Sequence, residues 1–168
     1  MVADAGIVHE RSAPRDHNQS AFIDRECRTL LEGVQTAMIQ SGAPVSFWSE
    51  AAKHFAFTRN NVPRHKKSVK GREVFVSANN IFENSDRLFN LTHLVAFGTQ
   101  ATCYLPPERR EGGKGPGQGK TFNGVIIGYV EDMSAYRVFD LGKRKVREVS
   151  FNFCVISEGF YPFKNESL

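Results

Sequence analysis

The sequence predicts an α+β protein in which a helical hairpin is followed by a small five-stranded β-barrel. Apolar residues between positions 20 and 60 recur at helical spacing. After Leu94 they alternate as in strands, with turn residues between short runs. Because about five short strands in roughly 65 residues cannot cover both faces of an open sheet, we expect them to curl into a barrel.

Two amphipathic helices are predicted in the first third of the chain. The first begins at Ser20, a suitable N-cap, and ends at residues 41–44, where a glycine is followed by proline. The second begins near Ser46 and ends before Pro63, because the residue before a proline is disfavoured in a helix. The apolar face of the first helix is expected to consist of Phe22, Cys27, Leu30, Leu31, Val34 and Met38.

The strand-like part of the chain contains a glycine-rich loop at residues 112–119. The loop is followed by Lys120 and Thr121, as in a phosphate-binding loop. However, Lys114 stands where that motif needs glycine, and a strand follows where it needs a helix. We therefore expect a flexible hairpin loop. The strands are predicted at residues 96–105, 122–130, 135–140, 144–149 and 151–156.

These patterns divide the chain into five parts. The segment after the helices is expected to be a mostly irregular basic linker with one helical turn around residues 81–83. The predicted parts are a tail at 1–19, the helical hairpin at 20–62, the basic linker at 63–93, the barrel at 94–157 and a second tail at 158–168.

Composition excludes several classes of protein. The three cysteines and five histidines lack the spacing of a metal site or a disulfide framework, so we expect reduced thiols in an intracellular protein. No apolar run approaches the ~20 residues of a membrane span, and the N-terminus lacks the pattern of a secretory signal. We therefore expect neither a membrane partner nor a bound cofactor.

Two basic segments favour a nucleic-acid partner, although the net charge of +4 alone does not. The first, residues 59–72, has no acidic residue, and a solvated linker explains it equally well. The second, residues 137–148, has a surplus of three positive charges near Tyr129, Tyr136 and Phe139, aromatic residues that we expect to be mostly core. The predicted phosphate-binding cations are Arg59, Arg64, Lys66, Lys67, Lys70, Arg72, Arg137, Lys143, Arg144, Lys145 and Arg147.

Five motifs, taken in order, carry a family resemblance. They are the segments 20–32, 41–51, 91–98 (Leu-Thr-His-Leu-Val-Ala-Phe-Gly), 126–129 and 136–140. Their succession resembles the C-terminal part of the integrase in copia-type retrotransposon polyproteins, and the resemblance covers residues 17–157. Segment 91–98 is a specific match to the start of the region called the retroviral polymerase SH3-like domain.

The resemblance implies the end of a ribonuclease-H-like catalytic core followed by an SH3-like barrel. The parent enzyme would integrate DNA with Mg²⁺ or Mn²⁺. Asp24, which periodicity alone makes an ordinary surface carboxylate, stands at the position of the family's catalytic Glu and is one methylene shorter. The family's two further catalytic Asp residues come from an upstream core, and the 23 residues before Asp24 are too few to supply it. Where the family has Ser-Arg-Asp-Val, residues 150–153 are Ser-Phe-Asn-Phe.

We therefore expect a non-catalytic part of a DNA-handling protein, nuclear if functional, that binds DNA through its phosphates and without sequence preference. Two alternatives stay open. The helical hairpin could leave apolar surface exposed without the rest of the core, which would make it a protein-interaction module that associates with integrase or with itself. The second alternative is that the sequence is a truncated retroelement reading frame without function.

Overall fold

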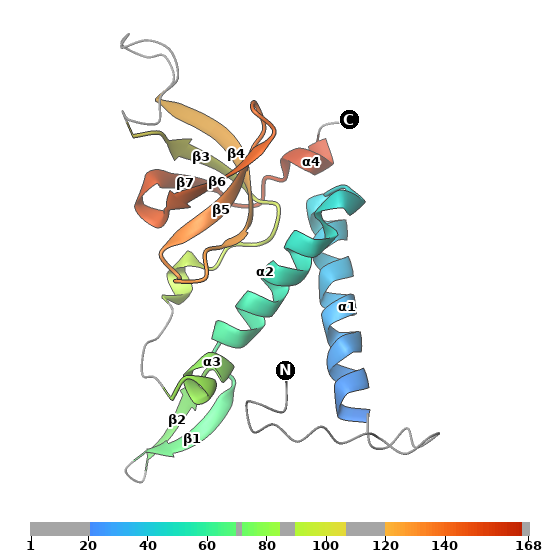
Figure 1. Cartoon of the computed structure of the whole chain (residues 1–168), viewed down its shortest axis with the longest axis vertical. Helices are drawn as coiled ribbons and strands as arrows, with labels where there is room; N and C mark the ends of the chain where they lie inside the picture. Colours follow the sequence, from blue (N-terminus) through green and yellow to red (C-terminus); the bar gives the residue numbers. More distant parts are fainter. Residues whose placement is uncertain (1–20, 70–71, 85–89, 107–119, 166–168) are drawn as a thin grey trace, which may run out of the picture.

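The computed structural model describes residues 21–69, 72–84, 90–106 and 120–165, and Figure 1 shows helices on one side of a strand-rich region. The first element is helix α1, Ala21–Ser41, and the second helix is α2, Trp48–Asn61. The order of helices followed by strands confirms the predicted α+β class. The predicted N-cap Ser20, both ends of the chain and the glycine-rich loop lie outside the described residues.

The helical hairpin is confirmed, and a glycine sets its turn. Gly42 adopts a φ of 68°, and its N–H bonds the carbonyl of Met38 at 2.9 Å, which closes the C-terminus of α1. A short 3₁₀ helix, η2 (Val45–Phe47), then leads directly into α2. The helices approach closely because Gly33 has no side chain: a Cβ there would lie 2.1 Å from Cε2 of Phe55.

The segment predicted as an irregular basic linker contains regular structure. Strands β1 (His65–Val69) and β2 (Arg72–Val76) form an antiparallel hairpin, and the short helix α3 (Ala78–Phe82) follows. Ser77 caps α3 by accepting the backbone N–H of Asn80 at 3.1 Å. The described side chains of β1 and most of those of β2 are exposed, so no buried apolar alternation marked the strands in the sequence.

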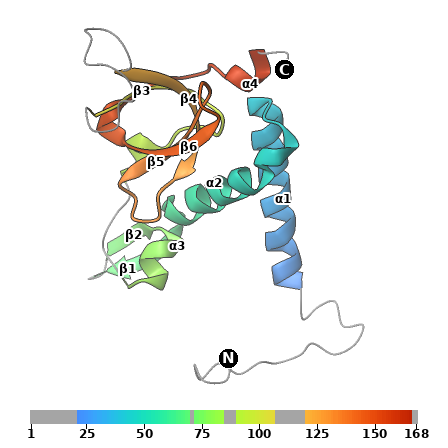
Figure 2. The ribbon, with the colours of Figure 1, turned by 45° about the horizontal axis from the view of Figure 1, so that its top comes forward.

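Five further strands form one antiparallel sheet in the order β6-β5-β4-β3-β7. Within the described residues β6 and β7 are the unpaired edges, so the predicted closed barrel is not confirmed, although Figure 2 shows a strongly curved sheet. A 3₁₀ helix, η5 (Phe151–Phe153), connects these two edge strands. The strands are β3 (Gln100–Tyr104), β4 (Thr121–Tyr129), β5 (Ala135–Asp140), β6 (Lys145–Ser150) and β7 (Cys154–Ser157).

Two strand boundaries differ from the prediction. Residues 96–99, expected to begin a strand, form a turn in which Gly98 has a φ of 83° and donates to the carbonyl of Ile126 at 2.8 Å. A Cβ at Gly98 would lie 2.2 Å from that of Ser41, so this turn packs tightly on the end of α1. The predicted strand at 151–156 starts with η5, and only its second half is extended.

The core has two parts that meet at the sheet. Ile126, Tyr136 and Val138 belong to a buried cluster formed by strands of the sheet. A second cluster, Val34, Ala51, Phe97 and Ile127, joins both helices to the opposite side of β4. The helical hairpin and the sheet therefore share apolar packing.

The C-terminal segment, predicted as a tail, is packed onto the molecule. It contains the short helix α4 (Pro162–Asn165), which Figure 1 places beside the C-terminal end of α1. Phe163 is buried, with its ring 5.1 Å from that of Phe47 and 6.4 Å from that of Phe139. Because the three rings come from distant segments, local sequence patterns gave no sign of this contact.

Candidate nucleic-acid interface

The β1–β2 hairpin carries one group of the predicted cations. Lys66, Lys67 and Arg72 are exposed. Lys66 bonds Glu73 at 3.1 Å, but the two side chains are 62% and 72% exposed, so solvent screens this pair strongly. Arg64, just before β1, is also exposed and donates to the carbonyl of Arg59 at 2.8 Å. The predicted Lys70 lies outside the described residues.

The turn between β5 and β6 carries the second group, Lys143, Arg144 and Lys145, all exposed. A buried carboxylate shapes this turn: Asp140 accepts the backbone N–H groups of Gly142 and Lys143, both at 3.0 Å. Arg144 adopts a φ of 51°, a left-handed conformation that completes the tight reversal. The turn therefore presents three consecutive cations on a backbone held by Asp140.

Three other predicted cations lie in ion pairs within the protein. Arg59 bonds Glu26 at 2.6 Å, which joins α2 to α1. Arg137 bonds Glu50 at 2.5 Å, which joins β5 to α2. Arg147 bonds Asp140 at 2.8 Å with side chains only 12% and 4% exposed. These three side chains hold elements together, a role that charge counting along the sequence could not distinguish from phosphate binding.

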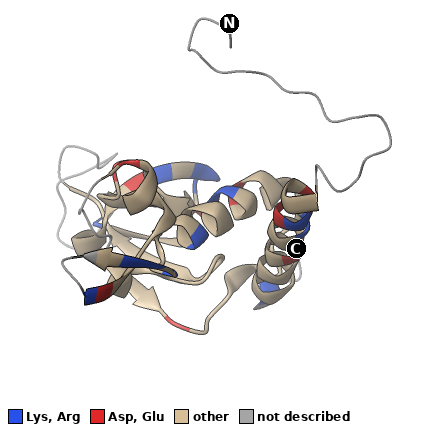
Figure 3. Ribbon diagram, turned by 90° about the horizontal axis from the view of Figure 1, so that it is seen from below, with Lys and Arg blue, Asp and Glu red and all other residues tan. Residues whose placement is uncertain are grey.

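The exposed cations form two patches. Figures 1 and 2 place the β5–β6 turn at the end of the sheet away from the β1–β2 hairpin. Figure 3 shows Lys and Arg positions spread over several elements of the described chain, without one continuous band. Exposed Lys and Arg side chains of this kind are the groups that contact phosphates in nucleic-acid complexes.

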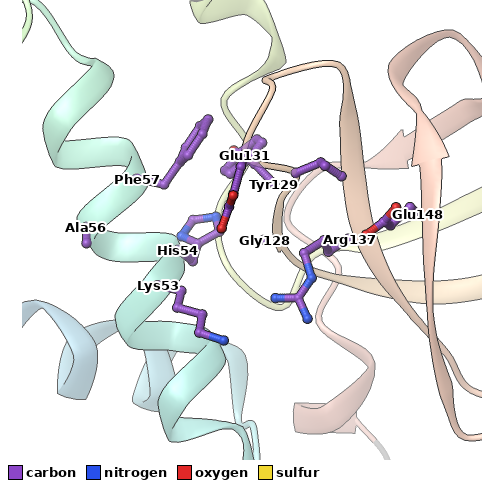
Figure 4. Close-up of a pocket in the computed structure, with 10 residues that line it drawn as sticks. Lys53, His54, Ala56, Phe57, Gly128, Tyr129, Glu131, Arg137 and Glu148 are labelled. Carbon is purple, nitrogen blue, oxygen red and sulfur yellow. The ribbon is translucent and has the colours of Figure 1, made fainter. Parts of the chain in front are cut away.

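A cleft of about 560 Å³ lies between α2 and the strands β4 and β5, and the sequence did not predict it. Figure 4 shows Lys53 and Arg137 on its two sides, with Glu131 and Glu148 also at its wall. The charges of these two positive and two negative side chains cancel. The cleft is therefore not an electrostatic site for anions such as phosphate.

Beside this cleft a buried histidine joins α2 to the sheet. Nε2 of His54 donates to the carbonyl of Val95 at 3.0 Å, and burial lowers the pKa of His54 to about 4. The hydroxyl of Tyr129 accepts the N–H of Val95 at 2.8 Å, and burial raises the pKa of Tyr129 to about 12. Both backbone groups of Val95 are thus satisfied by side chains, which makes this a structural junction.

The aromatic residues near the second basic segment belong to the core, as predicted. Tyr129 and Tyr136 are buried, and Phe139 packs against Phe47 with ring centroids 5.0 Å apart. Exposed rings occur elsewhere, at Tyr104 and Phe153, whose centroids are 5.8 Å apart beside a groove of about 350 Å³. Arg147 and Glu148 both line this groove, and their charges cancel. The charge of the groove therefore does not favour nucleic acid.

The structure places Asp24 on the exposed surface of α1. Across the described ranges no group of three or more His, Cys, Asp or Glu side chains is close enough to hold a metal ion. None of the described helices combines the length and apolar character that crossing a membrane requires.

The five sequence motifs indicate a protein related to retroelement Pol polyproteins. The comparison with known proteins agrees: the chain is similar to the retrovirus-related Pol polyprotein from transposon TNT 1-94 of Nicotiana tabacum, with 28% identity over 149 residues. The match covers 87% of this chain and 10% of the relative, so the chain spans about a tenth of that polyprotein's length. The predicted relation to a retrotransposon Pol polyprotein is thereby confirmed. No family model and no solved structure matches the chain.

Proposed function

We propose that this chain binds the phosphates of DNA without sequence preference, as the end of the catalytic core and the SH3-like module of a retrotransposon integrase. The observation that carries the proposal is the β5–β6 turn. Lys143, Arg144 and Lys145 are consecutive and exposed there, while the neighbouring Arg147 is held by Asp140. Cations gathered on a backbone that Asp140 holds can neutralise neighbouring phosphates and release their counterions.

The sheet supports an SH3-like module with open edges. Its strand order, β6-β5-β4-β3-β7, is that of a meander whose last strand returns to pair with the first. Because η5 is only three residues long, the curvature of the sheet must bring the two edge strands, β6 and β7, near each other. The basic turn between β5 and β6 lies at one end of this module.

The salt dependence of DNA binding tests the proposal. The double variant Lys143→Gln/Arg144→Gln is expected to weaken binding to duplex DNA and to reduce the slope of log K against log salt by about 2, since each lost phosphate contact removes about 0.9. A control, Arg25→Gln/Arg28→Gln, removes the same number of exposed cations from α1 and should bind like the wild type. Binding that does not weaken with salt would contradict a phosphate-driven mode.

We also propose that this chain alone does not catalyse strand transfer. In the family that it resembles, the Asp24 position supplies one of several carboxylates that hold two metal ions. A strand-transfer assay with Mg²⁺ or Mn²⁺ should give the same background for the wild type and for Asp24→Ala. Product formation that Asp24→Ala abolishes would overturn this part of the proposal.

A second candidate function is protein interaction, and the exposed apolar side chains of α1 favour it. Phe22 and Ile39 are 74% and 78% exposed, and Ile23 and Leu31 are exposed as well. At 100° per residue these four side chains point in different directions around α1, so a partner would have to enclose the helix instead of covering one face. Sedimentation over a range of concentrations tests for self-association, and a monomer at every concentration would count against it.

A further inference from the structure

Strands β3 and β7 bring two cysteines into contact. Cys103 and Cys154 are cross-strand partners, and their Sγ atoms lie 3.1 Å apart. They are 51 residues apart in the sequence, so their spacing along the chain did not indicate a pair. The remaining cysteine, Cys27, is exposed on α1.

The two thiols have different surroundings. Cys103 is fully buried in the core of the sheet, whereas Cys154 is half-buried on β7, which pairs with β3 alone in the described sheet. A hydrogen bond from the Cys103 thiol lowers the pKa of Cys154, although burial opposes this effect. The same hydrogen bond and burial raise the pKa of Cys103. Cys154 is the less buried of the two thiols and therefore the one that a small disulfide in solution reaches first.

We propose that Cys103 and Cys154 form an oxidative modification site, where a low-molecular-weight disulfide such as oxidised glutathione converts the two thiols into an intramolecular disulfide. The geometry carries this inference. Residues paired in an antiparallel ladder have Cα separations of about 4.5–5.5 Å, within the range of natural disulfides. From 3.1 Å the sulfur atoms need to approach by only about 1 Å to reach the bonded distance.

The reaction proceeds in two exchange steps. The Cys154 thiolate attacks one sulfur of the small disulfide, which forms a mixed disulfide on Cys154 and releases one small thiolate. Cys103 then loses its proton and attacks the Cys154 sulfur, which expels the second small thiolate. The two released thiolates take up the two protons. Two protein thiols are oxidised and one small disulfide is reduced to two thiols, so electrons and protons balance.

The disulfide would link the edge strand β7 covalently to its neighbour β3. In the described sheet β7 is held by its ladder with β3 and has no second strand beside it. A covalent link across that ladder closes a long loop and restricts the unfolded chain. The oxidised protein is therefore expected to unfold at a temperature on the order of 5–10 °C higher, with slower amide exchange in β7.

Mass spectrometry of the folded protein tests the site directly. The Cys27→Ser protein is incubated with oxidised glutathione, denatured and treated with iodoacetamide. We expect it to lose two hydrogens in mass, to gain neither glutathione nor an alkyl group, and to give a linked pair of peptides containing Cys103 and Cys154. Cys103→Ser in the same background should instead retain one glutathione on Cys154, because the thiol that resolves the mixed disulfide is missing.

Two results would overturn the proposal. One is alkylation of both Cys103 and Cys154 after an incubation that places glutathione on Cys27 of the wild type. The other is a disulfide between two chains in place of one within a chain. The linked peptide is measured in a protein that retains both thiols, so the test stands even if Cys103→Ser does not fold. In that case Cys154→Ser, at the less buried position, serves as the second variant and should take up no glutathione, because the remaining Cys103 is fully buried.

Discussion

The junction around His54 and the N-terminal half of α1 differ in burial. Ring side chains are buried at the junction, whereas the ring side chain on the N-terminal half of α1 is exposed. At the junction His54, Phe97 and Tyr129 are buried against one another across α2, the turn at residues 96–99 and β4. On α1, Phe22 and Ile23 are at least as apolar as His54 and Tyr129, yet they are exposed. An amphipathic pattern thus predicts a helix, but whether anything covers its apolar face depends on partners far away in the sequence.

The largest expected effect is a difference in the free energy of unfolding between a truncation in the core and one on the exposed part of α1. Phe97→Ala should lower the free energy of unfolding by about 3–5 kcal/mol, because it leaves a cavity where both helices meet the sheet. Phe22→Ala, on the exposed part of α1, should change it by less than about 0.5 kcal/mol. Urea unfolding measures both. Equal losses would mean that another chain covers α1 in solution.

A smaller contrast concerns the charged residues. Asp140→Ala should destabilise the protein by about 3 kcal/mol, because it leaves Arg147 in a nearly buried position and removes the acceptor that holds the β5–β6 turn. Glu73→Ala breaks the exposed pair with Lys66 and should have an effect below about 0.5 kcal/mol. Thermal unfolding of the two variants at the same pH gives the comparison, and a similar shift in both would refute it.

The third expected effect appears only on acidification. In the folded protein burial lowers the pKa of His54 to about 4, whereas its ordinary value of 6.5 applies to the unfolded chain. Between these values the unfolded chain binds more protons, so stability is full above pH 6.5 and is lost as the pH falls towards 4. The total loss is about 3 kcal/mol.

The variant His54→Gln should flatten this part of the pH dependence, and urea unfolding at several pH values measures it. His65→Gln, at an exposed position on β1, is the matched control and should keep the wild-type slope. An unchanged slope in His54→Gln would show that other groups cause the acid sensitivity.

The parts of the fold that the sequence predicted are those encoded locally. The glycine and proline at residues 42–44 marked the end of α1, and alternating apolar residues marked β4 and β5 almost to the residue. The β1–β2 hairpin was missed because its cations interrupt the alternation, and because it packs without a buried face. The open edges of the sheet were missed because strand patterns do not indicate which edges pair.

The candidate interface was predicted in part. Sequence composition identified the cations, but it could not tell Lys143 and Arg144 from Arg137 and Arg147, since the partners Glu50 and Asp140 are brought to them only by folding. The contact between Cys103 and Cys154 likewise depends on strand pairing. Residue type indicates possible chemistry, and the topology decides which side chains are exposed and which are brought together.

The packing of α4 has a consequence for how the chain folds during synthesis. The amide of Gln40, at the end of α1, donates to the hydroxyl of Tyr161 at 2.7 Å, and the two residues are 121 positions apart. The apolar surface at that end of the helical hairpin is completed by Phe163. A ribosome must therefore finish nearly the whole described chain before the first helix is fully covered, and until then that helix end stays open to other proteins.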